Sequence, residues 1–332
     1  MKSIQTVVGD VKSVILENEF LSIEILSYGA SIFHLCVKHN DDIIEVSVQP
    51  ENLDEFLTSP FYYGKTVGRT AGRLFHPSYS IGDTEYLLDE TSNPSFLHGG
   101  ENGFSFKHFD VVEYSETHVK LKAVSYEDEG PYDGILTLLT TYQIHQNTLE
   151  IMYEATTTAT TLCNLTNHVY LNVSKQPTIH DHQLTIHAHS YLNIDENNKI
   201  IRIDPVTSPL DFNQGLNLGE ALNIMEQTPF HGFDHTFIFN KEKDIQMEVE
   251  TDDMKMTLKT TNPSVVLYTH NKPAPHQLRH IEKDKNKHVA FTIETQYEPG
   301  GIQFDGLNNA ILTPHDTYYE TTTLEFQVKN TK

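Results

Sequence analysis

Four short stretches of the sequence combine glycines with ionisable side chains, and chemistry is most easily placed there. Together they supply an arginine, several histidines and two carboxylates, the residue types of a polar sugar site with acid–base capacity. Each stretch alone is a weak signal. The four stretches are Gly68–Arg73, Leu97–Gly100 with Gly103 and Phe104, Asn164–Tyr170, and Gly232–His235 together with Ile293–Gln296.

The stretch Gly68–Arg73 (GRTAGR) is not a nucleotide loop, because it contains no phosphate-binding lysine and does not join a strand to a helix. The formal net charge of the chain is -23 at pH 7, from 46 acidic and 23 basic residues. Such a surface repels nucleic acids and anionic membranes, so we expect neither as a partner. It also disfavours anionic substrates.

Alternation of apolar and polar residues predicts strands as the elements that position these stretches. Clear cases are Val119, Leu121 and Ala123, and Leu324, Phe326 and Val328. Residues 245–258 predict a hairpin that turns at 251–253. Residues 215–227 predict one short helix. The threonine-rich runs 156–161 and 320–323 favour strands, because β-branched residues suit a pleated surface.

The predicted strands recur about every ten residues and are separated by Gly, Asn, Asp or Pro. This spacing indicates an all-β protein, either an antiparallel sandwich or a barrel. We find no linker and no repeat of fixed period, so residues 1–332 are interpreted as a single domain. Only two cysteines occur, Cys36 and Cys163, which predicts no disulfide framework and fits a reducing, cytoplasmic setting. The first twenty residues have no apolar run typical of a signal peptide or membrane anchor.

The ordered set of motifs resembles the aldose 1-epimerase (galactose mutarotase) family over almost the full length. The resemblance is carried by SYGASI, GRTAGR, LHGG followed by GF, LTNHVYLNV, DPVTSPLDF, GFDHTF and ETQYEPGG, in the order of the family. It implies a large antiparallel β-sandwich, an isomerase that interconverts the anomers of a free hexose such as galactose or glucose, and no cofactor or metal. The expected partner is a small monosaccharide, and the expected assembly is a monomer or a homodimer.

The resemblance also implies roles for five residues. Glu294 matches the catalytic base and His168 the catalytic acid. Arg73, His98 and Asp234 match residues that hold the hydroxyls and the ring oxygen region of the sugar. Ordinary pKa values of about 4.3 for Glu and 6.5 for His would let Glu294 be ionised and His168 partly protonated near neutrality.

Without the resemblance, each of these residues has a simpler interpretation. Glu294 would be a solvent-facing strand carboxylate, His168 a structural histidine, and His98 a loop residue. Arg73 would be a surface cation, and Arg69 is expected to be one in either case. Asp234 would belong to a turn.

Other histidines and aromatic residues admit a similar choice. His180 with His182, and His187 with His189, could each chelate a metal from one face of a strand. We expect them to be surface histidines instead. His270, His276, His280 and His288 are expected in loops. Phe104, Phe233 and Tyr170 are conceivable stacking platforms for a sugar, although core packing is the default for all three.

The chain departs from the family pattern at three places. Gly72 stands where many members have Asn, Val266 where many have Gln, and Pro299-Gly300 where Pro-Asp is expected. These changes leave the acid and the base in place but put the preferred sugar in doubt. Two rival functions remain open: an epimerase for hexose 6-phosphates, for which Arg69 could help to bind phosphate, and a non-catalytic sugar-binding module on the same fold.

Overall fold

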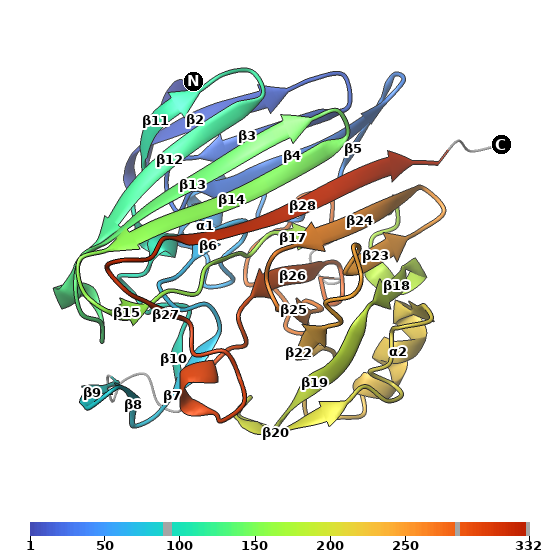
Figure 1. The fold of residues 1–332 in the computed structure, drawn as a ribbon. Coiled ribbons are helices and arrows are strands. Elements are labelled where there is room, and N and C mark those ends of the chain that lie inside the picture. The colour runs from blue at the N-terminus through green and yellow to red at the C-terminus, as the bar shows by residue number, and fades with distance from the viewer. Residues whose placement is uncertain (89–94, 283–285, 330–332) are drawn as a thin grey trace.

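A computed structural model describes residues 1–88, 95–282 and 286–329. All pairings between its named strands are antiparallel, and three large sheets dominate the fold (Figure 1). The fold class predicted from the sequence, an all-β protein with a large antiparallel sandwich, is therefore confirmed.

The largest sheet has nine strands and runs diagonally across Figure 1. Its strands, in spatial order, are β11 (Asp110–Tyr114), β12 (His118–Ser125), β13 (Leu136–His145), β14 (Thr148–Thr157), β28 (Tyr318–Val328), β24 (Met254–Thr260), β23 (Met247–Glu250), β18 (Gln183–Ile186) and β21 (Leu216–Asn217).

Two further sheets pack on the nine-stranded sheet through one continuous apolar core. The five-stranded sheet is formed in chain order by β1 (Lys2–Thr6), β2 (Gly9–Glu17), β3 (Leu21–Leu26), β4 (Ser31–His39) and β5 (Asp42–Glu45). The six-stranded sheet has the order β17 (Tyr170–Leu171), β26 (Phe291–Gln296), β25 (Ser264–Tyr268), β22 (Asp234–Phe239), β19 (Ala188–Ile194) and β20 (Ile200–Pro205).

Short elements complete the described part of the chain. The strand pairs are β7 (Arg73–Phe75) with β10 (Ser95–Leu97), β6 (Thr66–Val67) with β16 (Thr166–Asn167), β8 (Ser78–Ile81) with β9 (Thr84–Leu87), and β15 (Thr161–Leu162) with β27 (Ile311–Leu312). The helices are α1 (Leu53–Thr58), α2 (Leu218–Met225) and the single 3₁₀ turns η2 (Phe104–Phe106), η3 (Glu127–Glu129), η4 (Ile179–Asp181) and η6 (Gly301–Gln303). In these ranges, neither α-helix reaches the length and hydrophobicity that a membrane crossing needs.

Most local predictions are confirmed. The hairpin predicted over 245–258 is β23 and β24, and the helix predicted within 215–227 is α2. Helix α2 begins where the Asn217 side chain accepts a hydrogen bond from the backbone N–H of Glu220, a standard N-cap. The threonine run 320–323 lies inside β28, but the run 156–161 is divided between the end of β14 and the start of β15.

Strand β26 is the element that matters most for function, and all six of its residues are buried. Its odd-numbered side chains face the nine-stranded sheet: Thr295 Oγ1 lies 2.5 Å from Thr322 Oγ1 of β28. Because successive side chains of a strand point to opposite faces, Glu294 points the other way. That other face forms the floor of a cleft.

Candidate active site

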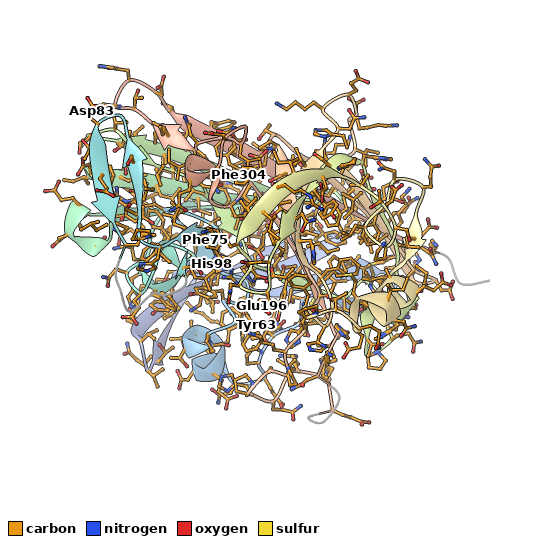
Figure 2. The ribbon with its side chains drawn as sticks, turned by 90° about the horizontal axis from the view of Figure 1, so that it is seen from below. Tyr63, Phe75, Asp83, His98, Glu196 and Phe304 are labelled. Carbon is orange, nitrogen blue, oxygen red and sulfur yellow. The ribbon has the colours of Figure 1, made fainter. Side chains whose placement is uncertain are left out.

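A cleft of about 500 Å³ opens on the outer face of the six-stranded sheet. All five predicted site residues line it: Arg73, His98, His168, Asp234 and Glu294. They come from segments that are as much as 221 positions apart in the sequence. Phe75 and Glu196 line the cleft as well. In the view from below, both lie near the centre of the molecule, as His98 does (Figure 2).

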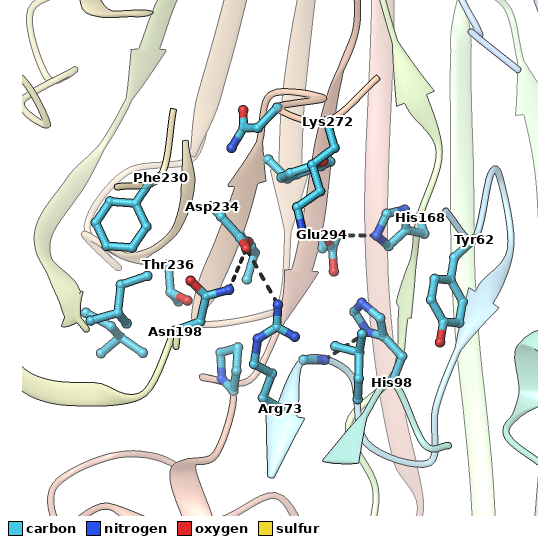
Figure 3. Close-up of a pocket in the computed structure, with 18 of the residues that line it drawn as sticks. Tyr62, Arg73, His98, His168, Asn198, Phe230, Asp234, Thr236, Lys272 and Glu294 are labelled. Carbon is cyan, nitrogen blue, oxygen red and sulfur yellow. Dashed lines mark hydrogen bonds and ion pairs between the residues drawn. The ribbon is translucent and has the colours of Figure 1, made fainter. Parts of the chain in front are cut away.

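Glu294 and His168 lie side by side in the cleft. His168 Nε2 is 3.3 Å from Glu294 Oε1, and the two side chains are only 6% and 4% exposed (Figure 3). Glu294 Oε1 also accepts a hydrogen bond from Thr292 Oγ1 at 3.2 Å. The backbone of His168 is fixed because its N–H donates to Lys65 O and its carbonyl accepts from Gly64 N–H. The solvent-facing alternative for Glu294 is therefore wrong.

Burial moves the pKa values of this pair in opposite directions. Loss of water around the carboxyl raises the pKa of Glu294 to about 8, and the negative charge of Asp234 adds to the rise. Burial lowers the pKa of His168 to about 4. The ordinary values assumed from the sequence are thus wrong for both groups. Over most of the range between these values the pair holds one proton, and in the empty cleft burial places it on Glu294.

His98 reaches the cleft from the end of β10 and is held by a reciprocal pair of hydrogen bonds with Gly72. His98 N–H donates to Gly72 O at 2.9 Å, and Gly72 N–H donates to His98 Nδ1 at 3.2 Å. Burial holds the pKa of His98 well below its usual range, so the ring is neutral. A neutral imidazole that accepts at Nδ1 carries its proton on Nε2, so His98 is a hydrogen-bond donor.

This tautomer bears on which ligand suits the buried cluster of His98, His168 and Glu294. One potential ligand atom from each of the three lies within 4.8 Å of the other two, a spacing that could suit a metal ion. However, Gly72 N–H occupies the only lone pair of the neutral His98 ring. The cluster therefore fits a sugar oxygen, which accepts a hydrogen bond, better than it fits a cation.

Asp234 and Arg73 face each other across the middle of the cleft floor. Asp234 begins β22, and its Oδ2 accepts a hydrogen bond from Asn198 Nδ2 at 2.9 Å and lies 3.7 Å from a terminal guanidinium nitrogen of Arg73 (Figure 3). Burial raises the pKa of Asp234, while Arg73 opposes that rise. An anionic acceptor beside a planar donor is a suitable pair for adjacent sugar hydroxyls.

Two glycines allow the loops to approach this closely. Gly99 has φ +82°, and a Cβ built on it would lie 2.2 Å from Gly68 O. Gly72 has φ +72°, and its Cβ would lie 2.4 Å from Cβ of Pro299. A side chain at position 72 would therefore displace Pro299. Gly72 and Pro299-Gly300, two of the places where the sequence departs from the expected pattern, therefore lie against each other in the structure.

Several predictions about other polar residues are wrong. Arg69 is not a surface cation: it is 1% exposed, and its guanidinium donates to Ser125, Thr161 and the carbonyls of Asp133 and Gly134. It cannot help to bind a phosphate in the cleft. His180 lies in η4 rather than on a strand, and His182 follows it and is fully buried. The surface interpretation holds for His180 and His189, which are exposed, but not for His182.

The remaining predictions for histidines and aromatic residues divide in the same way. His270 and His288 lie in loops as expected but are buried. Phe104 and Phe233 are fully buried in the core, as the default predicted. Tyr170 is also buried in an apolar cluster, but it lines the cleft as well. Sequence reasoning missed Tyr62, Asn198, Phe230, Thr236 and Lys272, which line the cleft as well. The aromatic run Phe61–Tyr63 was the only local signal for any of them.

Comparison with known proteins agrees with this geometry. A family model described as aldose 1-epimerase matches residues 12–325. The galactose mutarotase of Mus musculus is 32% identical over 96% of this chain and 95% of its own length, and that of Homo sapiens is 31% identical over the same shares. Among solved structures, the GalM/aldose epimerase homologue from C. elegans superposes with a TM-score of 0.89 at 24% identity, covering 96% of this chain and 100% of its own.

Proposed function

The chain belongs to the aldose 1-epimerase family, which makes it an isomerase, and we propose that Glu294 and His168 interconvert the α and β anomers of a free hexose such as galactose or glucose. One observation carries the assignment. A carboxyl and an imidazole lie 3.3 Å apart in a cleft that also presents a hydrogen-bond donor, His98, and an acceptor, Asp234.

The reaction needs two coupled proton transfers. Glu294 takes the proton of the anomeric hydroxyl while His168 gives a proton to the ring oxygen, and the C1–O5 bond breaks. The aldehyde then turns about its C1–C2 bond, O5 attacks the other face of C1, and both protons return. Nothing is oxidised or reduced. Each positioned proton transfer contributes roughly 10²–10⁴-fold to such a rate.

The resting proton must first be on His168, although burial favours Glu294. A bound sugar shifts that preference toward His168. A sugar hydroxyl that donates to the carboxylate lowers the pKa of Glu294 further than Arg73 already does. Because Nε2 and Oε1 are within direct reach, the proton can pass between them without a water molecule.

Arg73, His98 and Asp234 hold the sugar in this proposal. His98 donates through Nε2, Arg73 donates through its guanidinium, and Asp234 accepts from hydroxyls. The rival epimerase for hexose 6-phosphates has less support, because Arg69 is buried elsewhere and Arg73 already faces Asp234. Lys272 is the remaining lysine or arginine of the cleft lining in the described ranges.

Optical rotation tests the proposal and its rivals together. Pure α-anomers of galactose, glucose and a hexose 6-phosphate are dissolved with and without the protein, and the approach to equilibrium is followed. We expect acceleration with the free hexoses only. Acceleration with the 6-phosphate alone would favour that rival, and acceleration with none of them would favour a binding module.

Three further points remain part of the proposal. Cys36 and Cys163 are both free, which supports a reducing, cytoplasmic location. A monomer or a homodimer is expected, and light scattering in solution can decide between them. A single cooperative unfolding transition would support the interpretation of residues 1–332 as one domain.

A further inference from the structure

The cleft floor carries a straight row of side chains that starts at Glu294. Val266 of β25 pairs with Glu294 of β26, and Thr236 of β22 pairs with Val266. All three residues line the cleft. Neighbouring strands are about 4.8 Å apart, so Thr236 lies roughly 10 Å from Glu294 across the sheet.

His168 lies on the opposite side of Glu294 from this row. It precedes β17, which pairs with β26 along the edge that β25 does not use. Figure 3 shows the same order, with His168 to one side of Glu294 and with Asp234, Thr236 and Phe230 to the other. In the proposed reaction O5 is directed toward His168. Since O5 and C2 leave C1 in different directions, C2 is directed toward Val266.

The side chain that meets the C2 position is therefore apolar. Val266 is 7% exposed and has no donor or acceptor. Asp234 pairs with Tyr268 in the next row along the strands, which places it for hydroxyls farther round the ring. A C2 hydroxyl that enters this place loses its water and gains no hydrogen-bond partner, which disfavours its binding.

One side of the cleft is apolar and begins at Val266. Its other apolar residues are Leu192, Ile194 and Phe230. Thr236 lies on the cleft floor. Its hydroxyl makes no hydrogen bond with any residue of the described ranges, so it is available to a ligand. A group attached to C2 would thus meet apolar side chains first and a hydroxyl donor about 10 Å from Glu294.

We propose that this site accepts aldoses whose C2 carries an acylamino group in place of the hydroxyl, the class of 2-acetamido-2-deoxyhexoses. The acyl carbonyl accepts from the Thr236 hydroxyl, and the methyl group packs against Val266 and Phe230. The inference rests on the proposed function, because it uses Glu294 and His168 to orient the ring.

The test compares three sugars: galactose, 2-deoxygalactose and 2-acetamido-2-deoxygalactose, each supplied as one anomer and followed by optical rotation. We expect a kcat/KM for the acetamido sugar at least equal to that for galactose, and little loss with 2-deoxygalactose. Turnover of galactose with a more than tenfold lower kcat/KM for the acetamido sugar would overturn this inference and leave the proposed function standing. Turnover of none would overturn the proposed function.

Variants of Val266 and Thr236 test whether these two residues set the preference for the C2 substituent. Val266→Gln supplies a partner for a C2 hydroxyl and fills the space of the acyl group, so the ratio of acetamido sugar to galactose in kcat/KM should fall by roughly tenfold, which is about 1.4 kcal/mol. Val266→Thr keeps the volume and tests the same point if the glutamine variant does not fold.

Thr236→Val removes the proposed hydroxyl donor and should lower only the kcat/KM for the acetamido sugar. The matched control is Val112→Gln on β11, half-exposed and outside the cleft lining. An unchanged ratio in all three cleft variants would contradict the assignment.

Discussion

The nine-stranded and the six-stranded sheets consist of similar alternating strands but bury different kinds of residue on their faces. In β13 of the nine-stranded sheet, Leu136, Leu138 and Tyr142 face the core and the alternate residues are more exposed. In β26 of the six-stranded sheet both faces are buried, and the cleft face carries Thr292 and Glu294.

The difference suggests a division of roles: the nine-stranded sheet supplies apolar burial, and the cleft face of the six-stranded sheet supplies the ionisable groups. Apolar burial on the nine-stranded sheet stabilises the fold. On the cleft side, a carboxyl and an imidazole lose their water, and His168 Nδ1 and the Gln296 amide have no hydrogen-bond partner within the described ranges. Such groups cost stability, and sites of this kind persist because function requires them.

The largest expected effect on the rate comes from replacing a carboxylate of the six-stranded sheet, compared with one of the nine-stranded sheet. Glu294→Gln keeps the shape of the side chain and removes the base, so kcat should fall by roughly 10²–10⁴-fold with little change in KM. Optical rotation measures the loss. The matched control is Glu154→Gln, an exposed glutamate of β14, for which we expect wild-type rates. Full activity of the Glu294 variant would refute the assignment of the base.

The same variant should gain stability relative to the wild type as the pH rises. The folded-state pKa of Glu294 is raised to about 8, above its unfolded value, so its contribution to stability is full below about pH 4.3 and is lost as the pH rises through 8. Thermal melting of both proteins at pH 5 and pH 9 checks the sign.

The opposite outcome is expected for a core residue of the nine-stranded sheet. Leu138→Ala on β13 removes a fully buried side chain and should lower the free energy of unfolding by roughly 2–5 kcal/mol. Denaturant titration measures it. At a temperature where the variant is folded, kcat should match the wild type. A large loss of kcat in that folded variant would break the separation between the two sheets.

Asp234→Ala tests the middle of the cleft. The change removes the acceptor that Asn198 and Arg73 face, and a lost hydrogen-bond partner in a buried site costs about 1–3 kcal/mol. We expect KM to rise along with a fall in kcat. A KM equal to that of the wild type would count against a binding role for Asp234.

The pH profile of kcat/KM tests the one-proton state of the pair. Below about pH 4 both groups are protonated, and above about pH 8 both have lost their protons, so activity should form a plateau between these limits. Above pH 8 we expect about a tenfold fall per pH unit, after subtraction of the uncatalysed rate. An alkaline limb near pH 6.5 would instead indicate an unperturbed histidine.

The smallest expected effect concerns Lys65, a buried lysine whose backbone carbonyl accepts from the N–H of His168. Its Nζ donates to Leu57 O at 2.7 Å and lies 4.5 Å from the Phe106 ring centroid, and burial lowers its pKa to about 7. Between that value and the unfolded value near 10.4, the unfolded chain binds more protons, so the stability of the wild type rises with pH. Relative to Lys65→Met, the wild type should gain about 1 kcal/mol between pH 8 and 9. Lys122→Met, an exposed lysine of β12, is the control; an equal response of both variants would contradict the role of burial.

The local patterns predicted much of this fold because they depend on neighbours in the chain. Alternation identified β12, β28 and the β23–β24 hairpin, since one face of each strand is apolar. A short helix was predicted within residues 215–227, and α2 lies there. By contrast, Arg69 and His182 were placed on the surface because no local feature shows which core a polar side chain will enter. The hydrogen-bond partners of Arg69, such as Ser125, are distant in sequence.

By itself the sequence determined the strands, the all-β class and the motifs that contain Arg73, His98, His168, Asp234 and Glu294. Only the tertiary structure decided that these side chains share one cleft, that His98 is a donor, and that His168 Nε2 lies 3.3 Å from Glu294 Oε1. The physical reason is that a strand pattern reports only which face of a strand is apolar. Distances between strands, and the loss of water that shifts a pKa, arise only when remote segments pack together.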